Sequence, residues 1–428
     1  MLLRRGTLVA LDPLLVEQAD LRVQGERIVD RQRSLSPRAG EDEVDLEGML
    51  VLPGLVNAHT HLYSALARGM PAPANPPKNF VEVLEKVWWR LDRALDEEAV
   101  RLSALVGAIE AARSGTTLLI DHHSSPSFIE GSLETIRGAV EEVGLRSVLC
   151  YEVTDRNGAE GRDRGVRENE SFLRRGTSDL TRALVGAHAS FTLSDLTLDR
   201  LAAVVKETRR SLHVHVAEDK ADVEDCRSRH GCGLVERLHR HGLLVRALLA
   251  HCVHLEPAEI GEAHVHGAWF AHNPRSNMNN SVGQAPTEPL KRAALGTDGI
   301  DEDVLAEARA AFLKMRDAGR AEAAPATLQL LAGGHRLAAA LFGLPFGKLD
   351  SGGPADLVVL DYVPPTPLTT DNLIGHLLFG VDRSHVHSVM VAGRWIMRGR
   401  RLLTVDVAGV LARARDAAER LWVRMARP

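Results

Sequence analysis

The sequence predicts an α/β protein, a (β/α)8 TIM-type barrel with a small β-sandwich domain formed from both chain ends. Three observations predict this fold. Eight apolar runs in the middle of the chain alternate with helical stretches, which favours parallel strands. Nearly every run ends in histidine, aspartate, glutamate or asparagine, and barrel chemistry lies at the carboxyl ends of the strands. β-rich segments flank this middle part on both sides.

We expect strands and tight turns over 1–52, and apolar strands again over 355–362 and 387–403, so that 1–52 and 345–405 together form the small domain. A helix over 406–426, within a terminal segment 406–428, should pack on the surface. The barrel should occupy 53–344. Its eight runs are 51–61, 116–123, 146–155, 183–190, 211–219, 245–255, 267–274 and 293–299. The alternative, a doubly wound open sheet, would more often carry a glycine-rich phosphate turn after its first strand, and the sequence has none there.

Composition excludes several classes of protein. Of 428 residues, 45% are apolar and 25% are charged, which is ordinary for a soluble globular chain. The net charge of −5 argues against nucleic acid or an anionic membrane as partner. No apolar run is long enough to span a membrane, and the first residues lack a signal-peptide pattern. None of the four cysteines forms a CxxC motif, so we expect a reduced, cytoplasmic setting.

Two histidine pairs indicate a metal site. His59 and His61 lie two residues apart at the end of a predicted strand, as do His213 and His215, and residues two apart share a face of a strand. Glu218 follows where the second of these strands should become a loop, and a carboxylate there could move protons for a metal-activated water. Taken alone, each pair also fits ordinary core or surface histidines, and Glu218 fits a solvated loop charge.

Two further strand ends add candidate ligands. His251 ends a strongly apolar run, and Asp298 ends the eighth run in the segment LGTDG. An aspartate before glycine is also a common turn residue. Three imidazoles, one carboxylate and a water molecule would nevertheless satisfy a catalytic zinc ion.

The motifs PGLVNAHTHLY, HVHVAED, AHCVHL, HNPRSN and LGTDG occur in this order and resemble the amidohydrolase superfamily. The most similar branch is that of the cytosine deaminase/chlorohydrolase-like aminohydrolases. Within it, the segments HLYSALARGM, LIDHHSSP and NPRSNMNNSVGQAP resemble the SsnA-type aminohydrolases. The resemblance covers nearly the whole chain, and five ordered motifs at barrel spacing are highly specific.

This resemblance implies roles for single residues. It implies that the metal ligands are His59, His61, His215 and Asp298. Glu218 would then shuttle protons, His251 would hydrogen-bond the attacking hydroxide or the substrate, and Asp298 would also act as a base. Binuclear relatives have a bridging lysine on the fourth strand, where this chain has His188. We therefore expect one divalent metal ion, zinc first and iron as the alternative.

Several side chains are candidate substrate contacts. His188 matches a family position that often contacts substrate, and His123 lies in a His-rich second strand end that many relatives lack. Asn273 and Asn277 surround the seventh strand end, although asparagine-rich segments are usually turns. Trp88 lies on a helical stretch where it either packs on the barrel or stacks on a flat heterocycle. The roles of His122 and His213 stay open, with packing or support favoured for His213.

We therefore predict a metal-dependent hydrolytic deaminase in which metal-bound hydroxide attacks a small nitrogen heterocycle, with a purine or a purine-catabolism intermediate as candidate substrate. A cyclic-amide or halide hydrolase on the same metal site is the alternative, and an inactive scaffold is the third hypothesis. The partners would be a small heterocycle and water, without nucleic acid or membrane, and family analogy suggests a homodimer. The loops 62–80 and 156–170 should determine selectivity, and 155–171 reads as a flexible charged lid or a solvated loop.

Overall fold

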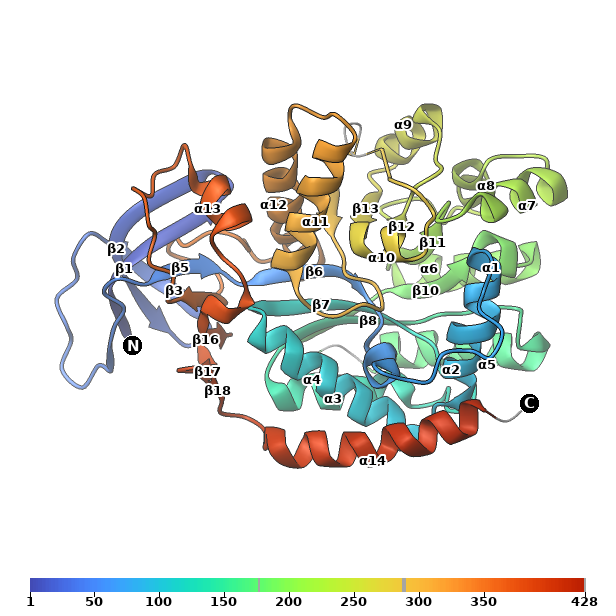
Figure 1. Ribbon diagram of the computed structural model, residues 1–428, viewed down its shortest axis with the longest axis horizontal. Coiled ribbons are helices and arrows are strands. Elements are labelled where there is room, and N and C mark those ends of the chain that lie inside the picture. Colours follow the sequence, from blue (N-terminus) through green and yellow to red (C-terminus); the bar gives the residue numbers. More distant parts are fainter. Residues whose placement is uncertain (176–177, 287–289, 427–428) are drawn as a thin grey trace.

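A computed structural model describes residues 1–175, 178–286 and 290–426 (Figure 1). Its centre consists of two parallel sheets, and each of the eight predicted runs contains one of their strands. The four-stranded sheet contains β6 (Leu55–Thr60), β7 (Thr116–His123), β8 (Arg146–Tyr151) and β9 (Thr181–Ala183). The five-stranded sheet contains β10 (Val185–Ala189), β11 (Leu212–Val216), β12 (Leu248–His251), β13 (Trp269–His272) and β14 (Ala293–Leu295). The predicted α/β class with parallel strands is therefore confirmed.

Backbone hydrogen bonds join the two sheets along both of their edges. At one edge the amides of Thr297 and Asp298 donate to the carbonyl of His59, each at 2.9 Å. At the other edge the amide of His188 donates to the carbonyl of Val153 at 2.9 Å. The end of β6 therefore lies beside the segment that follows β14, and the segment that follows β8 lies beside β10.

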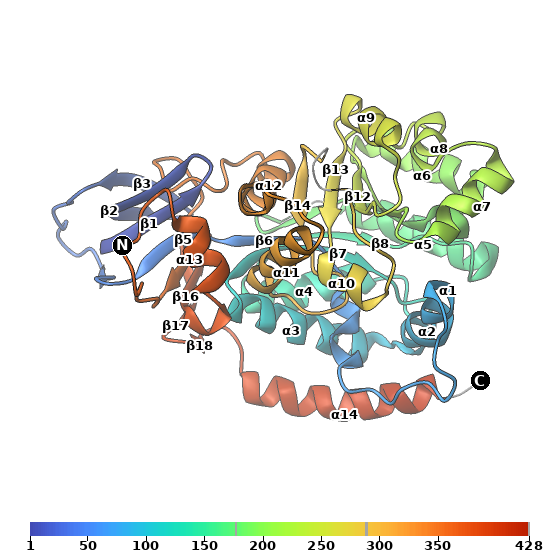
Figure 2. The same ribbon diagram turned by 45° about the horizontal axis from the view of Figure 1, so that its top comes forward.

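Helices follow the parallel strands and cover them on the outside (Figures 1 and 2). They are α3 (Glu97–Arg113), α4 (Ser132–Val143), α5 (Gly158–Arg174), α6 (Asp195–Thr208), α7 (Lys220–His230), α8 (Leu234–Arg240), α9 (Pro257–Val265), α10 (Pro274–Asn279), α11 (Val304–Asp317) and α12 (Ala323–Phe342). The parallel strands are buried almost from end to end, as expected for sheets covered on both faces. Within the described part of the chain, no helix combines the length and the apolar character that crossing a membrane requires.

The two chain ends build a separate nine-stranded sheet, which lies to the left in Figure 1. Its strands are β1 (Leu2–Leu11), β2 (Leu14–Gln24), β3 (Arg27–Gln32), β4 (Glu43–Asp45), β5 (Leu50–Pro53), β15 (Leu357–Leu360), β16 (Val386–Val391), β17 (Arg394–Arg398) and β18 (Arg401–Leu402). Strands β5 and β15 pair antiparallel and join the two ends of the chain. The predicted run 51–61 thus contributes to both parts of the fold, because β5 ends at Pro53 and β6 begins at Leu55.

A C-terminal helix, α14 (Val407–Met425), lies along α3 and the short helix α2 (Trp89–Ala94) (Figure 2). The indole of Trp422 donates to the carbonyl of Leu66 at 3.0 Å, and the guanidinium of Arg424 donates to the carbonyl of Ala94 at 2.7 Å. Helix α14 thereby contacts both ends of one segment of the chain. This segment consists of a 3-10 helix (Leu62–Ala67), α1 (Phe80–Val83), a π-helix (Leu84–Trp88) and α2.

The charged segment 155–171 is not the flexible lid or solvated loop that its composition suggested, because residues 158–174 form helix α5. The carboxylate of Glu168, which is buried, accepts from the amides of Gly131 (3.0 Å) and Leu133 (3.1 Å) at the start of α4. A charge that looked solvated therefore satisfies the free backbone donors of a neighbouring helix.

Replacement of Arg146 by alanine should strongly destabilise the fold. Arg146 is 1% exposed and binds both carboxylate oxygens of Asp356, at 2.7 and 3.1 Å, thereby linking β8 to the nine-stranded sheet. Removing one partner of a buried ion pair leaves an uncompensated charge and costs about 3–5 kcal/mol. Urea unfolding followed by circular dichroism measures this loss. The exposed Arg174, 2.9 Å from Glu207, is the matched control, and its alanine variant should lose at most about 1 kcal/mol. Equal losses for the two variants would contradict the prediction.

Candidate active site

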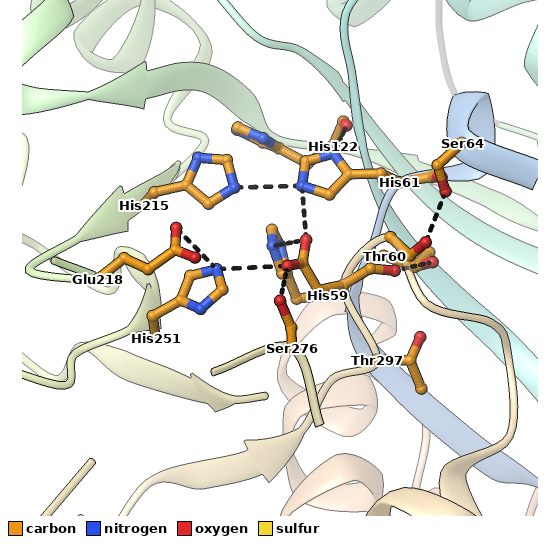
Figure 3. Close-up of polar contacts among 12 residues, drawn as sticks. His59, Thr60, His61, Ser64, His122, His215, Glu218, His251, Ser276 and Thr297 are labelled. Atoms are coloured by element: carbon orange, nitrogen blue, oxygen red, sulfur yellow. Dashed lines mark hydrogen bonds and ion pairs between the residues drawn. The ribbon is translucent and has the colours of Figure 1, made fainter. Parts of the chain in front are cut away.

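The four predicted metal ligands converge at the carboxyl ends of β6, β11 and β14 (Figure 3). Nε2 of His61 lies 3.2 Å from Nε2 of His215 and 3.0 Å from Oδ1 of Asp298. Nε2 of His59 lies 3.6 Å from the same carboxylate oxygen. One ligand atom from each residue lies within 4.8 Å of all the others. Three imidazole nitrogens and a carboxylate oxygen form a donor set that suits zinc.

The second nitrogen of each imidazole is held by a partner that turns the first nitrogen toward this cluster. Nδ1 of His61 donates to the carbonyl of His122 at 2.5 Å, and Nδ1 of His215 donates to the carbonyl of His188 at 2.9 Å. Nδ1 of His59 and Nε2 of His213 share a hydrogen bond of 2.9 Å. Such outer partners fix the orientation and tautomer of metal-binding histidines. His213 therefore supports His59.

A second group of possible ligands contains His61, His122, Glu152 and His215. It shares His61 and His215 with the first group, and the Nδ1 atoms of both residues are already bound to backbone carbonyls. Each of them thus has one nitrogen left for an ion. The described residues can fill one of the two groups at a time, but not both.

Glu218 and His251 stand beside the four ligands (Figure 3). Oε2 of Glu218 lies 3.6 Å from Nε2 of His251, and its Oε1 accepts from the side-chain amide of Asn280 at 3.2 Å. Nδ1 of His251 bonds the side-chain oxygen of Asn277 at 2.8 Å, which turns Nε2 toward Glu218 and Asp298. Burial and the nearby Asp298 charge raise the pKa of Glu218 to about 7. A carboxyl group with this pKa can accept and release a proton near neutral pH.

Electrostatics keep Asp298 ionised. Burial works against its charge, but contacts with His59 and His61 hold its pKa well below the usual range. Burial lowers the pKa of His61, and Asp298 outweighs that effect and raises the pKa to about 9. Burial lowers the pKa of His59 to about 3. The cluster thus has a firmly ionised carboxylate.

Strained backbone places two of these side chains. His251 has a φ of 70° and Asp298 a φ of 53°, which is the left-handed region that residues other than glycine rarely adopt. Such conformations cost of order 1–3 kcal/mol and occur at functional sites, where the surroundings hold them. The hydroxyl of Ser276 donates to Oδ2 of Asp298 and provides one such contact (Figure 3).

A pocket opens above the cluster. One wall is aromatic or aliphatic, with Phe80, Leu84, Trp88, Trp89 and Phe191. Six carboxyl groups line it, and no lysine or arginine of the described residues does; these are Asp92, Glu152, Glu218, Asp219, Asp222 and Asp298.

The predicted substrate contacts divide into two sets. His188 and Trp88 line the pocket. His123, Asn273 and Asn277 are buried but are not part of its lining. His123 instead bonds Ser125 at 2.8 Å, and Asn277 bonds His251. The structure thus gives Asn277 and His123 internal partners.

Sequence reasoning missed Glu152, Ser276 and Glu302. The carboxyl group of Glu302 is buried under β6, where the amide of Asn57 and the hydroxyl of Thr60 donate to it, each at 2.7 Å. Glu152 directly follows β8, and this position at a strand end was the signal that could have identified it. Ser276 and Glu302 have no comparable signal, because they follow the strands by several residues.

Comparison with known proteins gives a family and several relatives. The model of the amidohydrolase family matches residues 50–396. A 5-methylthioadenosine/S-adenosylhomocysteine deaminase of Desulforudis audaxviator is 33% identical over 399 residues, covering 89% of each chain. A 5'-deoxyadenosine deaminase of Methanopyrus kandleri is 31% identical over 402 residues, again covering 89% of each chain.

Solved structures agree with this result. An adenosine deaminase from Xanthomonas campestris with bound zinc has a TM-score of 0.87 and 25% identity, covering 99% of this chain and 98% of its own. The atrazine chlorohydrolase TrzN from Arthrobacter aurescens, also with zinc, has a TM-score of 0.83 and 21% identity, covering 97% and 99%. At that identity the second likeness concerns the fold alone.

Proposed function

Because the chain belongs to the amidohydrolase family, we propose that it is a hydrolytic deaminase of an uncharged purine-type heterocycle and uses one divalent metal ion. The observation that carries this proposal is the convergence of His59, His61, His215 and Asp298 beside Glu218 and His251. The relatives named as deaminases of adenosine derivatives support the reaction class.

We further propose that the two parallel sheets form one closed eight-stranded barrel over 53–344, in which β9 and β10, separated by Leu184 alone, count as one strand. The hydrogen bonds at both sheet edges support this closure. The segments 1–52 and 345–405 would form the small β-sandwich domain, and the pairing of β5 with β15 supports their association. The third unit, 406–428, contains α14, and its residues 427–428 lie outside the described part of the chain.

His59, His61, His215 and Asp298 would hold the ion, for which zinc is our first choice and iron the alternative. When bound, a divalent ion there would lower the pKa of a water molecule, so that this water could lose a proton and attack a ring carbon at neutral pH. Glu218 takes one proton of this water and transfers it to the ring nitrogen next to the attacked carbon. Nε2 of His251 accepts a hydrogen bond from the water and orients it. Asp298 would pass the remaining proton of the added oxygen to the amino group, which leaves as ammonia while the carbon–oxygen double bond forms.

The pocket favours an uncharged, flat substrate. Its aromatic wall provides stacking surface, and we propose that Trp88 contacts the heterocycle there. The acidic lining would repel a carboxylate or a phosphate. Arg156 is the nearby cation, but its guanidinium is bound to Asp92. His123, Asn273 and Asn277, predicted as substrate contacts, are proposed here to support the site from behind.

The test is ammonia release by the zinc-loaded protein. The panel contains 5'-deoxyadenosine, 5'-methylthioadenosine, adenine, guanine, aminopyrimidines and pterins. We expect ammonia from at least one uncharged purine and no release after the metal is removed with a chelator. Release of chloride from a chlorotriazine, or opening of a cyclic amide without ammonia, would instead favour the alternative hydrolase reactions. Absence of both metal and activity would favour an inactive scaffold.

A small heterocycle and water remain the proposed partners, with a homodimer as the proposed assembly. All four cysteines are buried and free, which fits the proposed reducing cytoplasm.

A further inference from the structure

One buried carboxylate in the pocket has an oxygen that accepts no hydrogen bond from any of the described residues. Asp222 accepts from the backbone amides of Phe191 and Ala217, Asp219 from that of Ala221, and Asp92 from Arg156 and Ser124. Glu218 and Asp298 belong to the reaction centre described above. Glu152 remains, and it is 3% exposed at the pocket wall.

Glu152 has two imidazoles as neighbours. Its Oε2 lies 3.2 Å from Nδ1 of His122, whose other nitrogen donates to the carbonyl of His213. Its Oε1 lies 3.7 Å from Nε2 of His188, which is beyond hydrogen-bond distance. One carboxylate oxygen thus faces the pocket beside an imidazole nitrogen that it does not bond.

Hydrogen bonding determines which nitrogen of His188 carries the hydrogen. The hydroxyl of Thr192 donates its hydrogen to the carbonyl of Ala189, so it accepts from Nδ1–H of His188 at 2.7 Å. In the neutral ring, Nε2 then carries a lone pair and no hydrogen. Two acceptors, Oε1 of Glu152 and Nε2 of His188, consequently point toward the same part of the pocket. Only a ligand that brings hydrogen-bond donors satisfies both.

We propose that Glu152 and His188 form a substrate subsite that accepts hydrogen bonds from two neighbouring O–H or N–H donors of an uncharged substrate. This inference rests on the proposed deaminase function and narrows its substrate class. A vicinal diol of a nucleoside sugar and the amino and ring N–H groups of a free purine base both provide such a donor pair. A substrate with a phosphate or carboxylate near this point is excluded.

The test compares Glu152→Gln with the parent protein in substrate affinity and metal content. Glutamine keeps the shape of the side chain but removes the charge and one acceptor oxygen. For an uncharged substrate, KM should rise about tenfold or more, because hydrogen bonds to a charged group are lost, while kcat should change less. The preference for 5'-deoxyadenosine over adenosine 5'-phosphate should fall by a similar factor. Bound zinc should stay at the parent value, since Glu152 is not a ligand in this proposal.

Two arms distinguish the source of the donors. If a sugar diol binds Glu152, 2',3'-dideoxyadenosine should bind the parent protein more weakly than 5'-deoxyadenosine, and Glu152→Gln should remove the difference. If a free base binds there, adenine or guanine should show the loss instead. Glu168→Gln is the matched control, because Glu168 is also buried but binds the start of α4 and does not line the pocket. Its KM should remain within about twofold of the parent value.

Calorimetry on proteins that carry Glu218→Gln separates binding from catalysis. If no ammonia is released but Glu152→Gln still weakens the binding of uncharged heterocycles, the deaminase function fails and the subsite stands. Unchanged affinity, loss of zinc in Glu152→Gln, or no binding of any uncharged heterocycle would each overturn the subsite. If Glu152→Gln does not fold, Glu152→Asp is the substitute. It keeps the charge but moves the carboxylate oxygens away from the substrate, so KM should also rise.

Discussion

We expect Glu218→Gln to lower kcat by about 10³-fold while the protein keeps its metal ion. General acid–base groups contribute typically 10²–10⁴-fold, and Glu218 is proposed to move a proton in two successive steps. Glutamine retains the shape and can still contact Asn280, but it cannot accept the proton of water. Ammonia release at saturating substrate measures kcat, and elemental analysis measures the metal.

The pH profile gives a second readout for Glu218. The ionised carboxylate is the active base, so kcat/KM should fall as the pH falls through the pKa of Glu218. That pKa is about 7 without an ion, and a bound cation favours the carboxylate, so the acid limb should lie at or below pH 7. The limb should disappear in the residual activity of Glu218→Gln. An unchanged kcat in this variant would exclude Glu218 from the reaction.

We expect Asp298→Asn to cost more, because it removes both a metal ligand and a proposed proton carrier. The asparagine oxygen is neutral and cannot balance the cation, and loss of the ion removes several kcal/mol of stabilisation, equivalent to about 10⁴-fold or more in rate. Zinc content after dialysis should fall to a small fraction of the parent value. A variant that keeps its zinc and its activity would contradict the proposed ligand set.

Ser276→Ala is the matched control for Asp298. It removes one hydroxyl that donates to Oδ2 of Asp298 and leaves the carboxylate in place. Loss of such an outer partner typically weakens metal binding about 10–100-fold. At saturating zinc, Ser276→Ala should therefore recover most of its activity, whereas Asp298→Asn should not.

The convergence of the four proposed ligands could be predicted because they lie at or near strand ends, where chain order and local pattern carry the information. His59 and His61 share a face of one strand, and the structure brings them to His215 and Asp298 through the parallel arrangement of the sheets. The family resemblance pointed to the same four residues. Local sequence and topology were sufficient here, because each of the four residues lies in a strand or within three residues of its end.

Other features depend on contacts that local sequence does not encode. Helix α5 was mistaken for a lid or loop because its charges look solvated, and only the fold shows that Glu168 binds the start of α4. The hydrogen bond of Asn277, a predicted substrate contact, goes to His251, which is 26 residues away in the sequence. The role of Glu152 depends on the tautomer of His188, which is determined by Thr192 and Ala189 rather than by the chain around Glu152.

The contacts of helix α14 have a consequence for the order of events during protein synthesis. Trp422 and Arg424 donate hydrogen bonds to the carbonyls of Leu66 and Ala94. Leu66 and Ala94 lie at the two ends of the segment that carries the aromatic pocket wall. The ribosome releases Trp88 and Trp89 long before it adds α14, and domains generally fold as the chain emerges. A nascent chain that has already assembled the parallel strands thus still lacks the contacts that fix this wall. The binding pocket should reach its final form only after α14 has left the ribosome, so the ligand-binding state of this protein is acquired late in translation.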